Sequence, residues 1–371
     1  MQGRPGAAKR ASGSSSSSTL VVLWGQLRGG VLVATSVLRH VLRPLAADLA
    51  LLGPNVTDTS SMLVRVARHR WSVPDAVDWG VYLGSVSRAS AWRAALCNLD
   101  GAQFLGGVSD CQKQHQLHQP ARGSTRRGGG SAAILLYYRY ALQQRLLALA
   151  SAPPPEGGLV YDWIVTSRAD YLWLCDLFDG APMASLEPAV YSPTTQTWGG
   201  YTDRIAVMHR THAHRALNVT RLLLSSTDFQ AQYVACTRNR SWMARGARTA
   251  ERLGRRVLTH EYLNLEALVM AAWLWYGLPV RLFRLPAVNV ALPRDPSRWS
   301  LAHHLAELAA FGLSLKGRAD EANWWGALKA CRTAPRSLMS AANGGINATL
   351  ADLNASAPAL VRRAMRLFGR T

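Results

Sequence analysis

The sequence predicts an α/β protein with a mainly parallel central sheet and helices on both faces of that sheet. Short apolar runs rich in β-branched and aromatic residues alternate along the chain with longer segments whose apolar residues recur at helical spacing. The clearest run extends from Leu159 to Val165 and is apolar on both faces over most of its length, as strands of parallel sheets are. With 371 residues, the chain can bury one large α/β core or two smaller ones.

The N-terminal part of the chain predicts a tail, a strand, a loop and a helix. Residues 1–18 are basic and rich in serine, which predicts a disordered tail. Leu20–Trp24 is an apolar strand, and Gly25–Gly30 is the loop that follows it. Apolar residues then recur at helical spacing over Val31–Leu52, where Gly53-Pro54 gives a stop signal, so one helix is expected there.

The middle of the chain predicts a second strand, a mobile loop and an amphipathic helix. The strand is expected within Met62–Val66 or within Val77–Leu83. Residues 112–131 are polar, rich in glycine and without period, which predicts the mobile loop. Ala132–Ala150 has strong helical periodicity and leads, through a proline-rich break, to the strand that begins at Leu159.

The remaining segments predict further strands and a helix, followed by a less organised C-terminal region. Ala189–Ser192 and Arg204–His209 are expected to be strands. Glu261–Tyr276 is expected to be a helix that Gly277 stops, before a strand over Val280–Leu285. Residues 291–371 are expected to form a helical C-terminal extension.

The strong positive charge of the chain does not predict nucleic-acid binding. The formal net charge is +20, but only four of the 42 basic residues are lysines. The arginines are scattered among many alanines along the whole chain, a pattern typical of codon bias in a GC-rich genome. A nucleic-acid-binding protein concentrates its charge in one stripe with interleaved aromatic residues. Arginine-rich nucleic-acid binding is therefore the least favoured function class.

The sequons and the cysteines give information about the cellular compartment in which the protein folds. Five N-x-[ST] sequons indicate passage through the secretory pathway, and we expect the Golgi lumen. They begin at Asn55, Asn218, Asn239, Asn347 and Asn354. No run of the chain reaches the roughly 18 apolar residues of a membrane-spanning helix, so no transmembrane segment is predicted. The five cysteines are widely spaced, which leaves open one or two disulfides or buried free thiols.

Two candidate sites follow the predicted strands directly. The loop after the first strand, which contains Gln26 and Arg28, has glycines that let backbone amides approach a ligand at the start of a helix. A tight turn is the plainer interpretation of these glycines. Arg168 and Asp170 follow the strand that begins at Leu159, at the carboxyl end where open α/β sheets bind ligands. A carboxylate there suits a divalent metal and a guanidinium suits a phosphate, whereas an ordinary salt bridge is the alternative.

Two further candidate sites involve acidic residues. The segment Trp198–Arg204 has two glycines, two aromatic residues and the pair Asp203-Arg204 immediately before a strand. Glycines permit close approach and aromatic rings stack on a base or a sugar, although a turn with a satisfied aspartate is also compatible. Glu266 lies in a helix that is apolar nearly all round, so its carboxyl must be paired, protonated or directed into a ligand cleft. A general base and a salt bridge to Arg168 or Arg204 both satisfy this requirement.

Six segments in a fixed order resemble a poorly characterised family of glycosyltransferase-like proteins from plants and algae. They span about residues 20–285. The segments are GQLRG, HVLRPLAADLALLGP, GGSAAILLYYRYALQQ, YDWIVTSRADYLWLCD, WGGYTDRIAVMHR and NLEALVMAAWLWYGLPVRLFR. The resemblance implies a GT-A-like, Rossmann-like fold for nucleotide-diphospho-sugars, with the glycosyltransferase domain over residues 19–290.

The resemblance also implies a metal, and this sequence departs from the family at that position. Such enzymes usually hold a divalent cation through Asp-x-Asp at the end of a central strand. Here the strand ends in Arg168-Ala169-Asp170, with one acid. Either Asp170 holds Mn²⁺ or Mg²⁺ together with water and phosphate ligands, or arginines replace the metal.

The function expected from these residues is transfer of a sugar from a nucleotide-diphospho-sugar donor to a glycan or protein acceptor. Asp203 or Glu266 is expected to be the acceptor base. Donor-binding residues are expected to be Gln26, Arg28, Arg168, Trp198, Gly199, Gly200, Tyr201 and Arg204. The incomplete acid pair favours the alternative of a catalytically inactive relative that binds a nucleotide or glycan.

Overall fold

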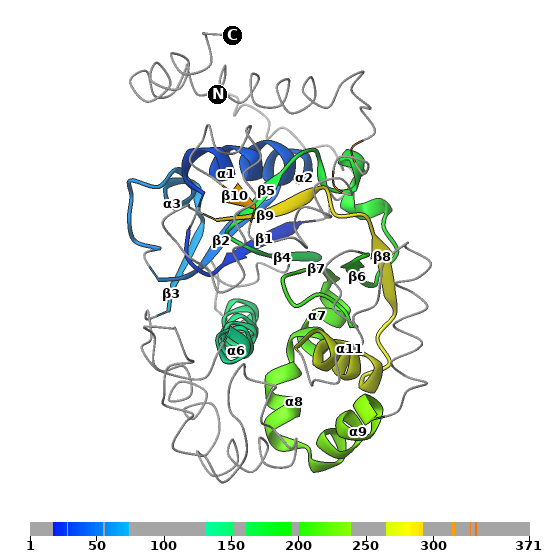
Figure 1. The fold of residues 1–371 in the computed structure, drawn as a ribbon. Helices are drawn as coiled ribbons and strands as arrows, with labels where there is room; N and C mark the ends of the chain where they lie inside the picture. Colours follow the sequence, from blue (N-terminus) through cyan, green and yellow to red (C-terminus); the bar gives the residue numbers. More distant parts are fainter. Residues whose placement is uncertain are drawn as a thin grey trace, which may run out of the picture.

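A seven-stranded sheet lies between two groups of helices in the computed structural model (Figure 1). The structure describes residues 18–27, 29–54, 56–73, 131–151, 161–194, 200–238, 265–291, 314, 315, 327 and 331. The strand order is β3-β2-β1-β4-β7-β6-β8. The strands are β1 (Thr19–Trp24), β2 (Asp48–Gly53), β3 (His69–Ser72), β4 (Trp163–Arg168), β6 (Val190–Pro193), β7 (Ile205–His209) and β8 (Val280–Phe283). The predicted α/β class is confirmed.

Six of the sheet's strands run in one direction, and β7 runs against them. The pairs β3·β2, β2·β1, β1·β4 and β6·β8 are parallel, whereas β7 is antiparallel to both β4 and β6. The predicted mainly parallel sheet is therefore confirmed. Because β7 is reversed, its start lies at the same sheet edge as the carboxyl ends of β1, β2 and β4.

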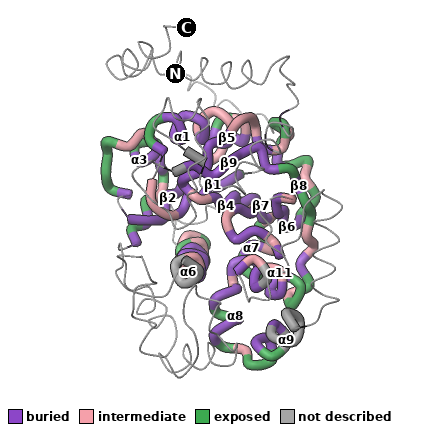
Figure 2. Tube along the Cα trace, in the orientation of Figure 1, coloured by how far each residue is buried: buried purple, intermediate pink, exposed green. Residues whose placement is uncertain are grey.

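Helices cover both faces of the sheet (Figure 1). One face carries α1 (Gly30–Val37), the π-helical turn η1 (Leu38–Leu42), α2 (Arg43–Leu45) and α3 (Met62–Val66). The other face carries α6 (Ser131–Ser151), α7 (Arg210–Leu217), α8 (Val219–Ser225), α9 (Thr227–Arg238) and α11 (Leu265–Trp275). Along β1, the side chains of Val21 and Leu23 pack on the face that carries α1, and those of Leu20 and Val22 pack on the face that carries α6. They alternate because successive side chains of a strand point to opposite faces of the sheet. Figure 2 shows the central strands buried over most of their length.

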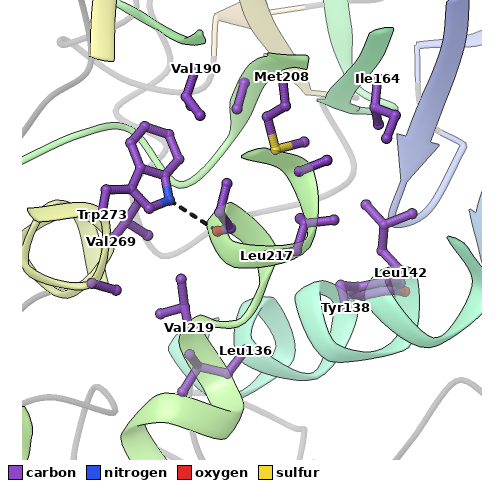
Figure 3. Close-up of a cluster of buried hydrophobic side chains, with 14 of the residues drawn as sticks. Leu136, Tyr138, Leu142, Ile164, Val190, Met208, Leu217, Val219, Val269 and Trp273 are labelled. Atoms are coloured by element: carbon purple, nitrogen blue, oxygen red, sulfur yellow. Dashed lines mark hydrogen bonds between the residues drawn. The ribbon is translucent and has the colours of Figure 1, made fainter. Parts of the chain in front are cut away.

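The core beneath α11 is fixed by a buried tryptophan (Figure 3). Trp273 has no exposed surface, and its ring Nε1 donates a hydrogen bond of 2.9 Å to the carbonyl oxygen of Ala216 in α7. Val269, Leu217 and Val190 pack around it. A buried indole without a partner for its N–H would be destabilising, so this hydrogen bond orients α11 on α7.

A second, smaller sheet lies beside the main one and is linked to the C-terminal part of the chain. It has the order β10-β9-β5, formed by β5 (Tyr171–Trp173), β9 (Ala287–Ala291) and β10 (Ser314–Leu315). A disulfide joins Cys175 to Cys331 across a sequence separation of 156 residues. The structure thus selects a disulfide for this cysteine pair, and it places a short strand inside the segment predicted to be a helical extension. The other described residues of that extension are Ala291, at the end of β9, Ala327 and Cys331.

Two sequence predictions in the N-terminal part are wrong. The helix predicted over Val31–Leu52 ends much earlier, and the last part of that range is the strand β2. Ala46 has a left-handed backbone (φ 45°) that closes the helix, and β2 is buried on both faces, so its continuous apolar run lacks the alternation that distinguishes a strand. The strand considered within Met62–Val66 is a helix, and the third strand of the sheet is His69–Ser72 instead.

Other predicted elements are found close to their expected bounds. The helix over Ala132–Ala150 and the strands at Ala189–Ser192, Arg204–His209 and Val280–Leu285 are α6, β6, β7 and β8. Several predictions concern residues outside the described part of the chain. These are the tail up to residue 17, the strand considered at Val77–Leu83, the loop at 112–130, the start of the 159–165 strand and most of the extension. None of the helices that the structure describes is both long enough and apolar enough to cross a membrane.

One sequon is built into the helical core. The side-chain Oδ1 of Asn218 accepts a 3.1 Å hydrogen bond from Gln143 Nε2, and its Nδ2 donates a 2.6 Å hydrogen bond to the hydroxyl of Tyr276. The hydroxyl of Thr220 is buried and donates to the Leu136 carbonyl oxygen at 2.6 Å. Asn218 therefore joins α6, α7 and α11, and its amide nitrogen is not presented to a glycosylating enzyme in the folded chain.

Asn218→Ala is expected to lower the free energy of unfolding by about 1–3 kcal/mol, because it removes the hydrogen bonds that join Asn218 to Gln143 and Tyr276 in a half-buried setting. Arg215→Ala, on the exposed side of α7, is the matched control and should change it by less than about 0.5 kcal/mol. Urea unfolding followed by tryptophan fluorescence measures both. Equal midpoints for the two variants would contradict the linking role of Asn218.

Candidate functional site

The candidate site lies at the sheet edge where β1, β2 and β4 end. The Gly25 amide donates to the Leu52 carbonyl oxygen at 2.9 Å, and the Ala169 amide donates to the Trp24 carbonyl oxygen at 3.0 Å. Gly53 lies so close to the carbonyl of Gly25 that a Cβ atom at this position would collide with it. The loop after β1, which contains Gln26, is thus held against the ends of β2 and β4.

Arg168 and Asp170 form a two-pronged ion pair at the end of β4. Nε of Arg168 donates to Oδ1 of Asp170 at 2.9 Å, and Nη2 donates to Oδ2 at 2.6 Å. The Asp170 side chain is only 4% exposed, whereas that of Arg168 is 21% exposed. The Asp170 carbonyl oxygen also accepts a hydrogen bond of 3.0 Å from the Val290 amide in β9, which fixes the backbone at this point.

The reversed strand β7 brings a second arginine and a second aspartate to the same place. The Arg168 amide donates to the Arg204 carbonyl oxygen at 3.1 Å, one residue before β7 begins. Arg204 also forms a loose ion pair with Asp203, with 3.9 Å between Nε and Oδ1. Asp203 is 4% exposed, and its Oδ1 has no hydrogen-bond partner within the part of the chain that the structure describes.

Glu266 and Arg139 complete the cluster from two helices. The Tyr201 amide donates to the Glu266 carbonyl oxygen at 3.1 Å, which places the first turn of α11 beside the segment that precedes β7. Nη2 of Arg139, in α6, donates to the Asp203 carbonyl oxygen at 3.1 Å. Arg139 is buried, and its Nε has no hydrogen-bond partner among the described residues.

The electrostatics of this cluster favour a protonated Glu266 near neutral pH. Burial and then the negative charge of Asp203 raise the pKa of Glu266 to about 8, although Arg204 and Arg139 act in the opposite direction. Burial lowers the pKa of Arg139 to about 10, against the effect of Asp203 and Glu266. Two neighbouring carboxyl groups in which one stays protonated near neutral pH can exchange a proton with a hydroxyl.

In contrast to that of Arg139, the pKa of Arg168 is raised. Its burial lowers the pKa of the guanidinium, but the charge of Asp170 and the hydrogen bonds to it outweigh burial, so the pKa is raised. Arg204 is close enough to lower it in turn. Arg168 and Arg204 are therefore two neighbouring cations at the exposed rim of the cluster, since each side chain is 21% exposed.

The structure brings together most of the residues that the sequence singled out. Asp170, Arg168, Arg204, Asp203 and Glu266 form one cluster at the sheet edge, connected by the contacts and charges described above. Tyr201 borders the cluster and stacks on Trp273 with 5.2 Å between ring centres. Gln26 lies in the loop after β1 at the same edge, and Gly200 in the segment before β7. Arg28, Trp198 and Gly199 lie outside the described residues.

Arg139 is the member of the cluster that sequence reasoning missed. It lies three residues after Leu136 and four before Gln143, and all three are buried on the inner side of α6. A lone arginine in line with the apolar stripe of an amphipathic helix was the available signal, because a cation on the buried face needs a partner.

The chemistry of the Asp170 carboxylate does not fit a bound Mn²⁺ or Mg²⁺ ion in this arrangement. Both of its oxygens accept hydrogen bonds from Arg168, and a cation would have to displace that guanidinium. Among the described residues, no three His, Cys, Asp or Glu side chains are grouped so that they could hold a metal.

Comparisons with known proteins assign no family to the chain. No family model matches the chain, and no curated protein matches it. Among solved structures, the chain is similar to mouse xyloside xylosyltransferase 1 in its apo form, at 8% sequence identity and a TM-score of 0.29. That similarity covers 72% of this chain and 84% of the mouse chain.

Glu266→Gln is expected to flatten the pH dependence of stability. The pKa of Glu266 is about 8 in the folded chain and 4.5 ordinarily, so between these values the folded state holds a proton that the unfolded state has released. The free energy of unfolding therefore falls as pH rises, by up to about 1.4 kcal/mol per pH unit.

Urea unfolding of both proteins between about pH 5 and about pH 8 measures this slope. Glu187→Gln is the control, because Glu187 is exposed and paired with Arg281 at 2.8 Å. A wild-type slope equal to that of Glu266→Gln would show that Glu266 keeps an ordinary pKa.

Proposed function

We propose that this protein transfers a sugar from a nucleotide-diphospho-sugar donor to a hydroxyl group of a glycan or protein. The observation that carries the proposal is the meeting of the acids Asp203 and Glu266, the first buried and the second half-buried, with two rim arginines at one sheet edge. Asp203 and Glu266 supply the acids, and Arg168 and Arg204 supply the cations. Open α/β sheets bind their ligands at this edge.

The acid pair is suited to receive the proton of the acceptor. Oδ1 of Asp203 is a buried acceptor and Nε of Arg139 is a buried donor, and neither has a hydrogen-bond partner among the described residues. Hydroxyl groups both donate and accept hydrogen bonds, so those of a ligand can satisfy atoms of both kinds. Buried polar atoms without partners are costly, which favours binding of a ligand rich in hydroxyl groups.

In the proposed transfer, one bond to the anomeric carbon forms and another breaks. The acceptor oxygen forms a bond to the anomeric carbon of the donor, and its proton passes to a carboxylate of the Asp203–Glu266 pair. The bond between the anomeric carbon and the diphosphate oxygen breaks, and its electron pair leaves with the diphosphate. Arg168 and Arg204 stabilise the negative charge that develops there. The loop with Gln26 and the segment from Gly200 to Tyr201 border the donor.

The proposed compartment is the lumen of the secretory pathway, most simply the Golgi. The Cys175–Cys331 disulfide and the sequons support it, because disulfides persist in oxidising compartments. The Asn218 sequon does not contribute, since its amide is engaged inside the helical core.

A second candidate function is donor or glycan binding without turnover. It is favoured by the closed ion pair of Asp170 with Arg168, which occupies the position where the resemblance places a metal-binding acid. This candidate predicts that a nucleotide or glycan binds and that no sugar is transferred.

Wild-type protein is expected to be stabilised against heating by one of the common nucleotide sugars and to release its nucleoside diphosphate when an acceptor is present. Asp203→Asn and Glu266→Gln should lower kcat by about 10²–10⁴-fold, because proton transfer is impaired, and should leave the thermal shift in place. A wild-type rate that rises with pH towards about 8, and a flat profile in Glu266→Gln, would assign the base.

Glu187→Gln serves as the control, since this glutamate lies on the exposed surface and pairs with Arg281. A thermal shift without turnover in the wild-type protein would select the binding function. Neither a shift nor turnover with any common nucleotide sugar would refute both candidates.

A further inference from the structure

The geometry points to an anion site in which Arg168 and Arg204, in place of a divalent cation, hold a diphosphate group. The inference rests on the proposed function for the identity of the anion, which is the diphosphate of the donor and of the leaving nucleotide. It goes further in stating that binding does not depend on metal and that Asp170 is a positioning residue. Each part follows from contacts at the end of β4.

Asp170 is committed to Arg168. The two hydrogen bonds, 2.9 Å and 2.6 Å long, match the fork of the guanidinium to both carboxylate oxygens. The Asp170 side chain is 4% exposed, so the ion pair is shielded from water on the aspartate side. A divalent cation at Asp170 would have to break both charge-assisted hydrogen bonds and leave Arg168 beside a second positive charge, which is unfavourable.

Arg168 and Arg204 are forced together by the sheet. The hydrogen bond of 3.1 Å between the Arg168 amide and the Arg204 carbonyl oxygen fixes the two backbones side by side. In β4 the side chain of Arg168 lies on the same face as that of Ile164, and Arg204, which directly precedes β7, is opposite Arg168 in the continued register of the β4·β7 pair. Both side chains therefore emerge on the face covered by α6 and α11. Although Arg168 pairs with Asp170 and Arg204 with Asp203, two adjacent guanidinium groups still attract an anion, and guanidinium groups bind phosphate well.

The charge of the whole cluster also favours an anion. Arg139, Arg168 and Arg204 contribute three positive charges. Asp170 and Asp203 contribute two negative charges, whereas Glu266 is mainly protonated near neutral pH. The cluster therefore carries one net positive charge. The cations that carry this excess at the rim are Arg168 and Arg204, because Arg139 is buried against Asp203.

Asp170 then acts through Arg168. By holding Nε and Nη2, it fixes the plane of the guanidinium and leaves the Nη1 group directed away from the carboxylate. The amide of Val290 holds the Asp170 carbonyl oxygen, so the small sheet supports this orientation from behind. An anchored guanidinium loses less conformational entropy on binding than a mobile one.

Calorimetric titration of the full chain with inorganic pyrophosphate and with uridine diphosphate tests the inference. The measurement is made in EDTA and again with MnCl₂. The affinity in EDTA is expected to be within about twofold of that in manganese. Arg204→Gln and Arg168→Lys should each weaken binding by about 10- to 100-fold, because a charge is lost in the first and the two-pronged geometry in the second. Arg210→Gln is the matched control, since Arg210 pairs with Asp162 at 3.5 Å at the opposite edge of the sheet.

Variants at Asp170 separate positioning from metal binding. Asp170→Asn should weaken pyrophosphate binding by a few-fold and leave the ratio of the affinities in manganese and EDTA near one. Because Arg168→Gln would leave Asp170 buried without its cation, the double variant Arg168→Gln/Asp170→Asn is used to remove both charges together. The double variant should melt at a temperature close to that of the wild-type protein. Its affinity for pyrophosphate should fall about as much as that of Arg204→Gln. A purely structural role of Asp170 would change the melting temperature but not the affinity.

The outcomes distinguish this inference from the proposed function. Binding that appears only with manganese and disappears in Asp170→Asn would overturn the inference, even if sugar transfer is observed. Binding in EDTA that depends on Arg168 and Arg204 would support it, even if no sugar is transferred. Binding that Arg210→Gln weakens as much as Arg204→Gln would also overturn it, since the attraction would then come from the general positive charge of the chain.

Discussion

The reversed strand β7 beside β4 is the constraint on which the candidate site depends. The antiparallel register pairs Ser167 with Ile205, so the residues just beyond this pair, Arg168 and Arg204, must lie next to each other. In a wholly parallel sheet, the start of β7 would lie at the opposite edge, and Asp203 and Arg204 with it. The reversal therefore converts two segments about 35 residues apart into one cluster of acids and arginines.

The helices on one face of the sheet supply the rest of the cluster and isolate it from water. α6 contributes Arg139, and α11 contributes Glu266 from its first turn, where the positive end of a helix favours a carboxylate. Trp273 fixes α11 on α7 through its hydrogen bond to Ala216, and Tyr201 stacks on the same tryptophan. The packing of the core thus determines how close Glu266 comes to Asp203, and this proximity contributes to the raised pKa of Glu266 after burial itself.

The cluster divides into an inner part for protons and an outer part for an anion. Asp203, Glu266 and Arg139 interact within the protein interior, where charges are weakly screened and a proton is retained near neutral pH. Arg168 and Arg204 lie at the rim with part of each side chain exposed. Sugar transfer from an activated donor needs both parts, one to accept the proton of the acceptor and one to stabilise the leaving diphosphate.

The sequence alone predicted those elements whose pattern was unambiguous. The helix α6 and the strands β1, β6, β7 and β8 were found near their expected bounds. β2 was missed because it is buried on both faces, and a short buried strand has the same apolar content as the end of a helix. The candidate residues Arg168, Asp170, Asp203 and Arg204 were recognisable because charged residues that directly adjoin buried strands stand out. Arg139 was not, since its partners come from distant segments.

The sequence by itself determined the α/β class, the positions of most strands and the residue types available at their ends, because these depend on local hydrophobic periodicity. Only the tertiary structure decided which of those residues meet. The direction of β7, the pairing of Asp170 with Arg168 and the approach of Glu266 to Asp203 all depend on contacts between segments far apart in the chain. A local pattern carries no information about such contacts, since the free energy that selects them comes from packing the whole core.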